Sequence, residues 1–377
     1  MVDMQHFGKT LQACRKEYGL TQNALADILG ISAQSVSYWE CGNGLPDVIH
    51  LCRIADVFSI SLDALLRNDE GRLKGLIGID GGGTKTEFVL IDERGHKLNS
   101  VTLGGSNPNT CGIDVAIDII FQGINYLRPK TMNVIGIFLG GAGMETGDNK
   151  NQVLRALQEA YPEIKVGCDN DIYNVIACSS EPDRCVAAIS GTGCVVNSSY
   201  QGTLRRVGGF GYLFECGGSG YDIGRDALTA ALRAGDGVGA STLVTGLIEE
   251  RLGGPIREHL HQLYQKDVSY IASFAPLVFQ AAAKKDPVAL EIMESNSEYM
   301  ARMIQTALSH AADIDHVIFS GGLFSKDELF FQSVKEKLNP CLAIERMTCP
   351  PVWGACLQCA KLCQLDEMPS LKNFLKE

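Results

Sequence analysis

The sequence predicts a mixed α/β protein built from two similar lobes and preceded by a small all-helical domain. The first observation is a pattern that occurs twice, in which an apolar strand runs into a Gly/Thr-rich turn and a second strand leaves it. Asp80 and Ser190 occupy matching places in the two copies, and the distance between them along the chain is that of a domain rather than of a solenoid repeat. The second observation is that residues 1–67 carry a succession of amphipathic helical patterns.

The length of 377 residues suits two or three domains. No apolar run approaches the roughly 18 residues of a membrane span, and the N-terminus lacks the features of a signal peptide. We therefore expect a cytoplasmic protein with no membrane partner, whose 14 cysteines are reduced thiols. The formal net charge of −11 argues against broad electrostatic attraction to nucleic acid or anionic membranes.

The N-terminal segment has the spacing of a helix-turn-helix. Thr21 can cap a helix, Gly30 permits a tight turn, and Ser32 can cap a second helix over residues 33–40. The first of these helices is expected to turn three apolar side chains inward, namely Leu25, Ile28 and Leu29. Three further helices are expected, over residues 7–18, 48–58 and 61–66. This segment resembles the Cro/phage-repressor family, which implies DNA binding.

In such a domain the early outward positions of the second helix reach base edges. These candidate DNA-binding residues are Gln34, Ser35, Ser37 and Tyr38. That helix contains no Lys or Arg, and residues 1–67 hold five basic against seven acidic side chains. Non-specific phosphate attraction should be weak. We therefore expect a homodimer that binds a specific operator, and the alternative is a helical protein-interaction module.

Each Gly/Thr-rich turn can bring backbone N–H groups and hydroxyls to phosphate oxygens, because glycine lets the backbone approach a ligand closely. Asp80, at the start of the first turn, can hold the partner metal ion of a phosphate. The phosphate-binding candidates are Gly81, Gly82, Gly83, Thr84 and Thr86 in the first turn, and Gly191, Thr192 and Gly193 in the second.

From about residue 75 to residue 365 the chain resembles the sugar kinase/heat-shock chaperone/actin superfamily, and within it the N-acetylglucosamine kinase branch of the BadF-type ATPases. The motifs that carry the resemblance lie at residues 80–86, 105–109, 170–171, 190–193, 208–212, 218–224, 320–322 and 350–355. The resemblance implies an actin-like ATPase fold, with two RNase H-like lobes around an ATP cleft, and the use of ATP and Mg²⁺. We expect a helix-turn-helix domain at 1–67, a linker at 68–74, a first lobe at 75–180 and a second lobe at 181–377 whose C-terminal helix packs back across the lobes.

The resemblance also implies roles for single residues. Asp171 matches the catalytic Asp of the family's Asn-Asp step and is assigned as general base and sugar ligand, with Asp169 as the local competitor. Asn107 matches an Asn that binds a sugar hydroxyl. Gly321 and Gly322 match glycines that lie against adenosine.

One stretch departs from the family pattern. Cys216 and Gly217 stand where the family has Asp and Glu, and a thiol is a poor hydrogen-bond partner for a sugar hydroxyl. Glu215, one residue earlier, is the candidate that could take over the contact with the sugar. Loss of this polar contact could lower the rate of turnover or change which sugar fits the site.

The functional prediction is an ATP-dependent amino-sugar kinase, similar to N-acetylglucosamine kinases, with a fused helix-turn-helix for transcriptional regulation. One alternative is a sugar- or nucleotide-sensing regulator whose kinase body has little or no activity. Another is a BadF-type ATPase that activates a dehydratase, because the spacing of Cys356, Cys359 and Cys363 also occurs in iron–sulfur sites. On a helix these cysteines share one face, so we favour packing in a core.

Overall fold

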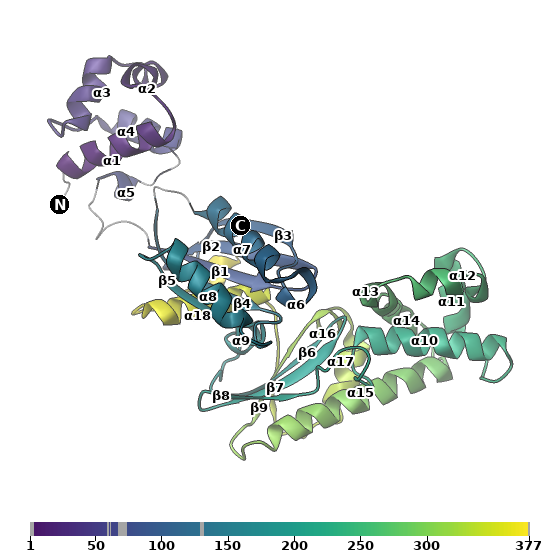
Figure 1. Ribbon diagram of the computed structural model, residues 1–377. Helices are drawn as coiled ribbons and strands as arrows, with labels where there is room; N and C mark the ends of the chain where they lie inside the picture. The colour runs from purple at the N-terminus through teal and green to yellow at the C-terminus, as the bar shows by residue number, and fades with distance from the viewer. Residues whose placement is uncertain (1–3, 59, 61, 67–73, 129–131, 376–377) are drawn as a thin grey trace. The chain divides into compact units, whose positions relative to one another are not determined.

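The computed structural model describes residues 4–58, 60, 62–66, 74–128 and 132–375. It contains a helical domain and two five-stranded sheets, each with its own hydrophobic core (Figure 1). This confirms the predicted combination of a small all-α domain with a mixed α/β body. Most of the predicted linker, residues 68–73, lies outside the described residues. Among the described residues, no helix has the length and hydropathy needed to cross a membrane.

The N-terminal domain consists of five helices: α1 (Met4–Glu17), α2 (Gln22–Leu29), α3 (Ala33–Glu40), α4 (Val48–Phe58) and α5 (Leu62–Leu66). The Thr21 hydroxyl accepts from the Ala24 N–H at 3.1 Å, and Ser32 caps α3 in the same way. Gly30 ends α2 with a φ of 73°, a conformation that favours glycine. The predicted caps and turn are therefore confirmed.

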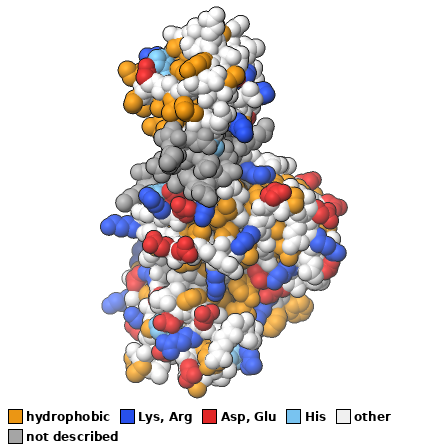
Figure 2. Space-filling view, turned by 90° about the vertical axis from the view of Figure 1, so that its left-hand side faces the viewer, with side chains coloured by type: hydrophobic (Ala, Val, Ile, Leu, Met, Phe, Trp, Pro, Cys, Tyr) orange, Lys and Arg blue, Asp and Glu red, His pale blue; other side chains and the backbone are white. Residues whose placement is uncertain are grey.

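The helical core contains Leu25, Leu29 and Val36, which are fully buried, together with Trp39. The expectation that Ile28 also points inward is wrong, because its side chain is 52% exposed. The buried face of α2 is completed by Ala26 instead. Figure 2 shows further hydrophobic side chains on the surface of this domain.

The first sheet has the strand order β3-β2-β1-β4-β5. Its strands are β1 (Lys74–Gly81), β2 (Lys85–Asp92), β3 (Lys97–Gly104), β4 (Asn133–Gly141) and β5 (Lys165–Asn170). β1, β2 and β3 form antiparallel pairs, whereas β1, β4 and β5 run parallel. The carboxyl ends of the parallel strands therefore meet at one edge, which is where ligands bind in open α/β sheets.

Helices cover both faces of this sheet (Figure 1). The helices of this region are α6 (Pro108–Cys111), α7 (Ile113–Leu127), α8 (Asn149–Ala160), α9 (Ile172–Ile176), α18 (Pro351–Cys363) and α19 (Leu371–Phe374). Helix α18 packs on β1 and β4 through Cys356 and Cys359, which are fully buried. Gly78 and Gly136 face these thiols so closely that a Cβ atom on either would overlap a sulfur. The predicted packing face of the cysteines is confirmed.

The second sheet repeats the first. Its order is β10-β9-β6-β7-β8, with β6 (Arg184–Ser190), β7 (Cys194–Tyr200), β8 (Thr203–Val207), β9 (His316–Ser320) and β10 (Ala343–Arg346). β6, β7 and β8 are antiparallel neighbours, and β6, β9 and β10 are parallel. Each strand of one sheet therefore has a counterpart in the other, as the repeated sequence pattern predicts.

The second sheet carries more helices than the first. They are α10 (Gly220–Gly235), α11 (Leu243–Leu252), α12 (Ile256–Tyr264), α13 (Val268–Ala272), α14 (Ala275–Ala283), α15 (Pro287–Leu308), α16 (Gly322–Lys326) and α17 (Glu328–Lys335). Helix α15 packs on β6, β7 and β8, and it also contacts α10, α14 and α17. One large core joins the sheet to these helices.

The chain forms two compact units, Met1–Asn174 with Pro351–Glu377, and Val175–Pro350. The predicted division after residue 180 differs from this, and the C-terminal helix, which was counted in the second lobe, belongs with the first unit. The physical reason is that α18 buries its cysteine face against β1 and β4. The predicted packing of this helix across both lobes stays a prediction.

Candidate active site

Polar residues gather at the carboxyl edge of the first sheet. Asp80 on β1 pairs with Gly140 on β4, and Gly140 pairs with Asp169 on β5. Asp171 follows directly after β5. The register therefore brings the two residues predicted as metal ligand and general base to the same edge.

The Asp80 carboxylate accepts a hydrogen bond from the Asn174 side chain, with 2.7 Å between Nδ2 and Oδ1. Burial, together with the nearby carboxylates of Asp171 and Glu87, raises the pKa of Asp80 to about 7, although the hydrogen bond from Asn174 lowers it in part. A bound cation would offset this accumulation of negative charge. Carboxylate oxygen is also the ligand that Mg²⁺ prefers.

No group of three or more His, Cys, Asp or Glu side chains within the described residues could hold a metal ion. Beside nucleotides, proteins usually hold Mg²⁺ through one or two carboxylates together with the phosphates. Asp80 therefore fits a magnesium ion that arrives with ATP.

Asp169 and Asp171 lie in different surroundings. Asp169 forms an ion pair with Lys150, with 2.8 Å between Nζ and Oδ2. Its other oxygen, Oδ1, accepts the Asn170 N–H at 3.0 Å. Asp171 is half-buried at the start of α9. The ion pair engages Asp169 with a cation, and the assignment of Asp171 as the base stays a prediction.

Asn107 lies at the same edge as a helix cap. Its Oδ1 accepts the Asn109 N–H at 3.0 Å, and a Cβ atom on Gly143, in the loop after β4, would lie 2.2 Å from that oxygen. Asn109 in turn donates to the Thr146 hydroxyl at 2.9 Å. The loops after β3 and β4 thus form one polar surface, of which sequence reasoning named Asn107 but missed Thr146.

The first Gly-rich turn is tight, with the Gly82 N–H donating to the Lys85 carbonyl at 2.9 Å. Gly83 and Thr84 are exposed at its tip, whereas Gly81 is buried at its base. The expectation that Thr86 faces a phosphate is not met in this structure. Thr86 is fully buried, and its hydroxyl bonds to the Gly104 carbonyl at 2.9 Å and to the Ser106 hydroxyl at 2.8 Å.

The second turn is joined to the start of α10. The Gly220 N–H donates to the Gly191 carbonyl at 2.8 Å, and the Tyr221 N–H donates to the Thr192 carbonyl at 3.1 Å. Thr192 and Gly193 are exposed. The first N–H groups of α10 are thus engaged by the turn, so the feature of this helix that still favours an anion beside the turn is its dipole.

Gly321 brings the end of β9 against this turn. Its φ is 99°, which strongly favours glycine, and a Cβ atom would lie 2.2 Å from the Ser190 carbonyl oxygen. Gly322 starts α16, and its Cβ direction is open. These glycines and the second turn therefore form one surface, where the sequence predicted phosphate and adenosine.

We expect Gly321→Ala to weaken ATP binding by about tenfold or more, because relief of the clash with the Ser190 carbonyl and of about 1–3 kcal/mol of backbone strain would move the end of β9 away from the second turn. Calorimetric titration with ATP measures the effect. Gly246→Ala in α11 is the matched control, because its Cβ would meet no atom within 4 Å. Equal affinities of wild type and Gly321→Ala would remove Gly321 from the nucleotide site.

Glu215 was expected to replace the missing sugar ligand, and this is not met in the structure. The side chain is only 6% exposed. It accepts the N–H groups of Gly209 and Phe210 at 2.5 and 3.0 Å and the Tyr299 hydroxyl at 2.6 Å. Glu215 therefore organises the loop before it, whereas Cys216 is exposed.

The candidate DNA-binding residues lie together on α3. Gln34 and Tyr38 are exposed, whereas Ser35 and Ser37 are half-buried. The Ser35 hydroxyl lies 2.9 Å from that of Ser32. Arg15 is buried in a bidentate ion pair with Glu40, at 2.5 and 2.9 Å, so it is not available to phosphates.

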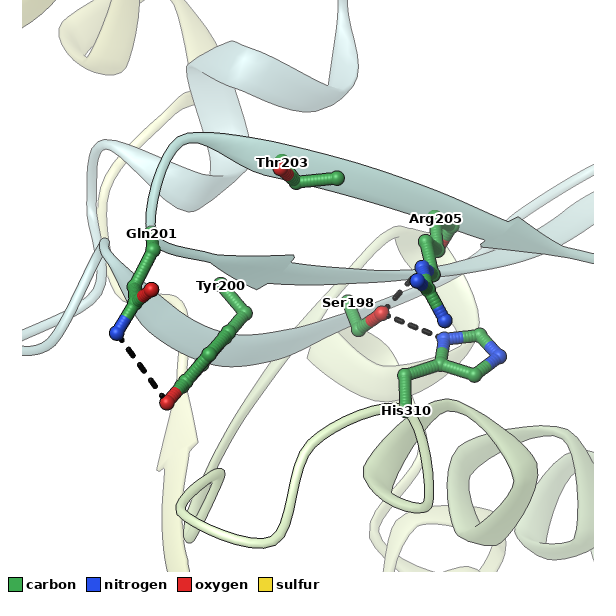
Figure 3. A pocket seen from close by; sticks show the side chains of 6 residues that line it. All are labelled: Ser198, Tyr200, Gln201, Thr203, Arg205 and His310. Atoms are coloured by element: carbon green, nitrogen blue, oxygen red, sulfur yellow. Dashed lines mark hydrogen bonds between the residues drawn. The ribbon is translucent and has the colours of Figure 1, made fainter.

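The second sheet also has a polar hollow at its β7–β8 hairpin, away from the Gly-rich turn (Figure 3). It is lined by Ser198, Tyr200, Gln201, Thr203, Arg205 and His310. The Ser198 hydroxyl lies 2.7 Å from His310 Nδ1. None of the predicted site residues lines this hollow.

Two sheets of the same strand order, each with a Gly-rich turn after its first strand, form the actin-like fold that the sequence predicts. Residues 77–356 match the model of the BadF/BadG/BcrA/BcrD ATPase family. The chain belongs to this family. Residues 11–65 separately match a helix-turn-helix family.

Relatives and solved structures agree with this assignment. The N-acetyl-D-glucosamine kinase of Dictyostelium discoideum is 29% identical over 310 residues, which cover 74% of this chain and 96% of the relative. A Chromobacterium violaceum structure assigned as an N-acetylglucosamine kinase superposes with a TM-score of 0.61 at 22% identity, covering 78% of this chain and 99% of that chain. A ROK family transcriptional regulator, homologous to Escherichia coli MLC, gives 0.53 at 13% identity and covers 96% of each chain. The two structural matches concern the fold.

Proposed function

We propose that the protein is an ATP-dependent amino-sugar kinase that transfers the γ-phosphate of ATP to a sugar hydroxyl, and that its helix-turn-helix domain regulates transcription. The observation that carries the enzymatic part is the carboxyl edge of the first sheet. There Asp80, Asp171 and Asn107 come from three separate segments to one row of strand ends. The likeness to an N-acetyl-D-glucosamine kinase supports the same reaction class.

Each part of the chemistry has a candidate residue. Asp171 would accept the proton of the attacking hydroxyl, and the Nδ2 group of Asn107 would donate to a sugar oxygen. Asp80 would hold Mg²⁺, which with ATP bound neutralises charge on the phosphates. The phosphate oxygens of ATP would accept hydrogen bonds from backbone N–H groups of the two exposed turns, around Gly83 and around Gly193.

ADP release from Mg·ATP tests the kinase directly. A panel of N-acetylglucosamine, glucosamine, N-acetylmuramic acid, N-acetylmannosamine and glucose would name the substrate class. We expect turnover with at least one amino sugar. If no sugar stimulates ADP release but a sugar raises the melting temperature, the protein is a ligand-sensing regulator, the alternative that the exposed Cys216 favours.

A role as a dehydratase-activating ATPase has less support. Such a role would need cysteines that can reach a cluster, and Cys356 and Cys359 are fully buried against the first sheet. Burial raises the pKa of the Cys356 thiol to about 12, as expected for a thiol packed in an apolar core.

The regulatory part of the proposal is a cytoplasmic homodimer that binds an operator. Gln34 is exposed at the start of α3, the position from which such helices read bases. The acidic balance of residues 1–67 disfavours binding through phosphates alone. Contacts between α3 and specific bases should therefore contribute most of the affinity for the operator.

Selection from random duplex DNA with the full chain should enrich a pair of half-sites about 34 Å apart. Gln34→Ala should lose about 1–3 kcal/mol of discrimination at one base pair of each half-site. Fluorescence anisotropy across salt concentrations measures both affinity and the salt slope, which we expect to be shallow. If no sequence is enriched, the helical domain is a protein-interaction module instead.

A further inference from the structure

Helix α9 contains a buried polar residue that sequence reasoning did not single out. Asn174 is fully buried and is followed in α9 by two buried apolar residues, Val175 and Ile176. Its amide group donates to Asp80 Oδ1 at 2.7 Å and to the Gly140 carbonyl at 3.3 Å. A buried amide aimed at a carboxylate makes a directional contact that fixes the position of that carboxylate.

The surroundings hold Asn174 in place. A Cβ atom on Gly140 would lie 2.1 Å from Asn174 Oδ1, and one on Gly354 would lie 1.7 Å from the Asn174 carbonyl oxygen. Strand β4 and helix α18 therefore close on this residue from two sides. Its own N–H donates to the Asp171 carbonyl at 3.0 Å. One residue thus links Asp80 to the turn that carries Asp171.

We propose that Asn174 is a positioning residue that holds the Asp80 carboxylate for the magnesium ion of Mg·ATP. The inference rests on the proposed role of Asp80. The hydrogen bond to Oδ1 limits rotation of the Asp80 carboxylate and so holds the group in one orientation for a cation.

Two variants of Asn174 distinguish the effect of its hydrogen bond from the effects of side-chain charge and volume. Asn174→Leu removes the donor with a side chain of similar shape, and Asn174→Asp replaces the donor with a third carboxylate. We expect either change to raise the Mg²⁺ concentration needed for half-maximal ADP binding by about 10–100-fold, because partners of metal-binding carboxylates have effects of this size. The KM for the sugar should stay near its wild-type value. Calorimetry with ADP across Mg²⁺ concentrations gives the first readout, and steady-state kinetics gives the second.

A double-mutant cycle with Asp80→Asn makes the test independent of any general loss of stability. If Asn174 acts through Asp80, adding Asn174→Leu to Asp80→Asn should change the Mg²⁺ dependence no further. Additive effects, or a wild-type Mg²⁺ dependence in Asn174→Leu, would overturn the proposal. Asn125→Asp on α7 is the matched control for charge, since Asn125 is exposed and bonds only to Tyr161 in the described structure.

The experiment also separates this inference from the proposed function. Mg²⁺-dependent ADP binding is measured without a sugar, so it reports on Asn174 even if no sugar is phosphorylated. Absence of sugar-dependent turnover in the wild type contradicts the kinase proposal alone. An unchanged Mg²⁺ dependence in the variants contradicts the role of Asn174 alone.

Discussion

Asp171→Asn should lower kcat by about a hundredfold to ten-thousandfold, the usual contribution of a general base. The amide keeps the size and shape of the carboxylate but cannot accept the proton of the sugar hydroxyl. ATP affinity should stay near the wild-type value, because the Gly-rich turns are untouched. Steady-state ADP release gives kcat, and calorimetric titration gives the affinity.

Asp169→Asn is the matched control for this substitution. It lies two residues away at the same sheet edge, and it breaks the 2.8 Å ion pair with Lys150. We expect a much smaller loss of kcat, because this carboxylate is already engaged by a cation. If Asp169→Asn loses more activity than Asp171→Asn, the base is Asp169 and the assignment must be exchanged.

Gly354→Ala should destabilise the first unit by about 3 kcal/mol, the upper end of the usual cost of overpacking. The added Cβ would lie 1.7 Å from the Asn174 carbonyl oxygen and 2.6 Å from its carbon. Backbone atoms cannot move aside as a flexible side chain can, so α18 would have to shift away from the sheet. Thermal unfolding followed by circular dichroism measures the loss.

Gly235→Ala at the end of α10 provides the comparison, because nothing lies within 4 Å of its Cβ position. This control should unfold at the wild-type temperature. A wild-type melting temperature for Gly354→Ala would mean that α18 does not pack as closely on α9 as the structure has it.

The sequence predicted the repeated sheets because each copy has strong local signals. Apolar strands of the length expected for a buried sheet flank each Gly-rich turn, and these patterns depend only on neighbouring residues. The caps of the helix-turn-helix at Thr21 and Ser32 are local in the same sense, and both are confirmed. Ile28 was misplaced because Leu25, Ala26 and Leu29 already form the buried face of this short helix, which leaves the neighbouring Ile28 outside it.

The details of the candidate site depend on contacts between distant segments, which no local pattern records. Thr86 looked like a phosphate ligand, yet Ser106 and Gly104 engage its hydroxyl. Glu215 looked like a spare carboxylate, yet the loop before it and Tyr299 surround it with donors. Asn174 had one usable signal, a polar residue within an otherwise apolar short helix. Its partner Asp80 lies on a strand far earlier in the chain.

The most direct measurement of the central claim is mass spectrometry of the sugar after incubation of the wild-type protein with Mg·ATP and N-acetylglucosamine. The proposed function predicts a product that carries one added phosphoryl group, formed in step with ADP and missing in Asp171→Asn. An unmodified sugar across the whole amino-sugar panel, with ATP left intact, would contradict the claim that this chain is an amino-sugar kinase.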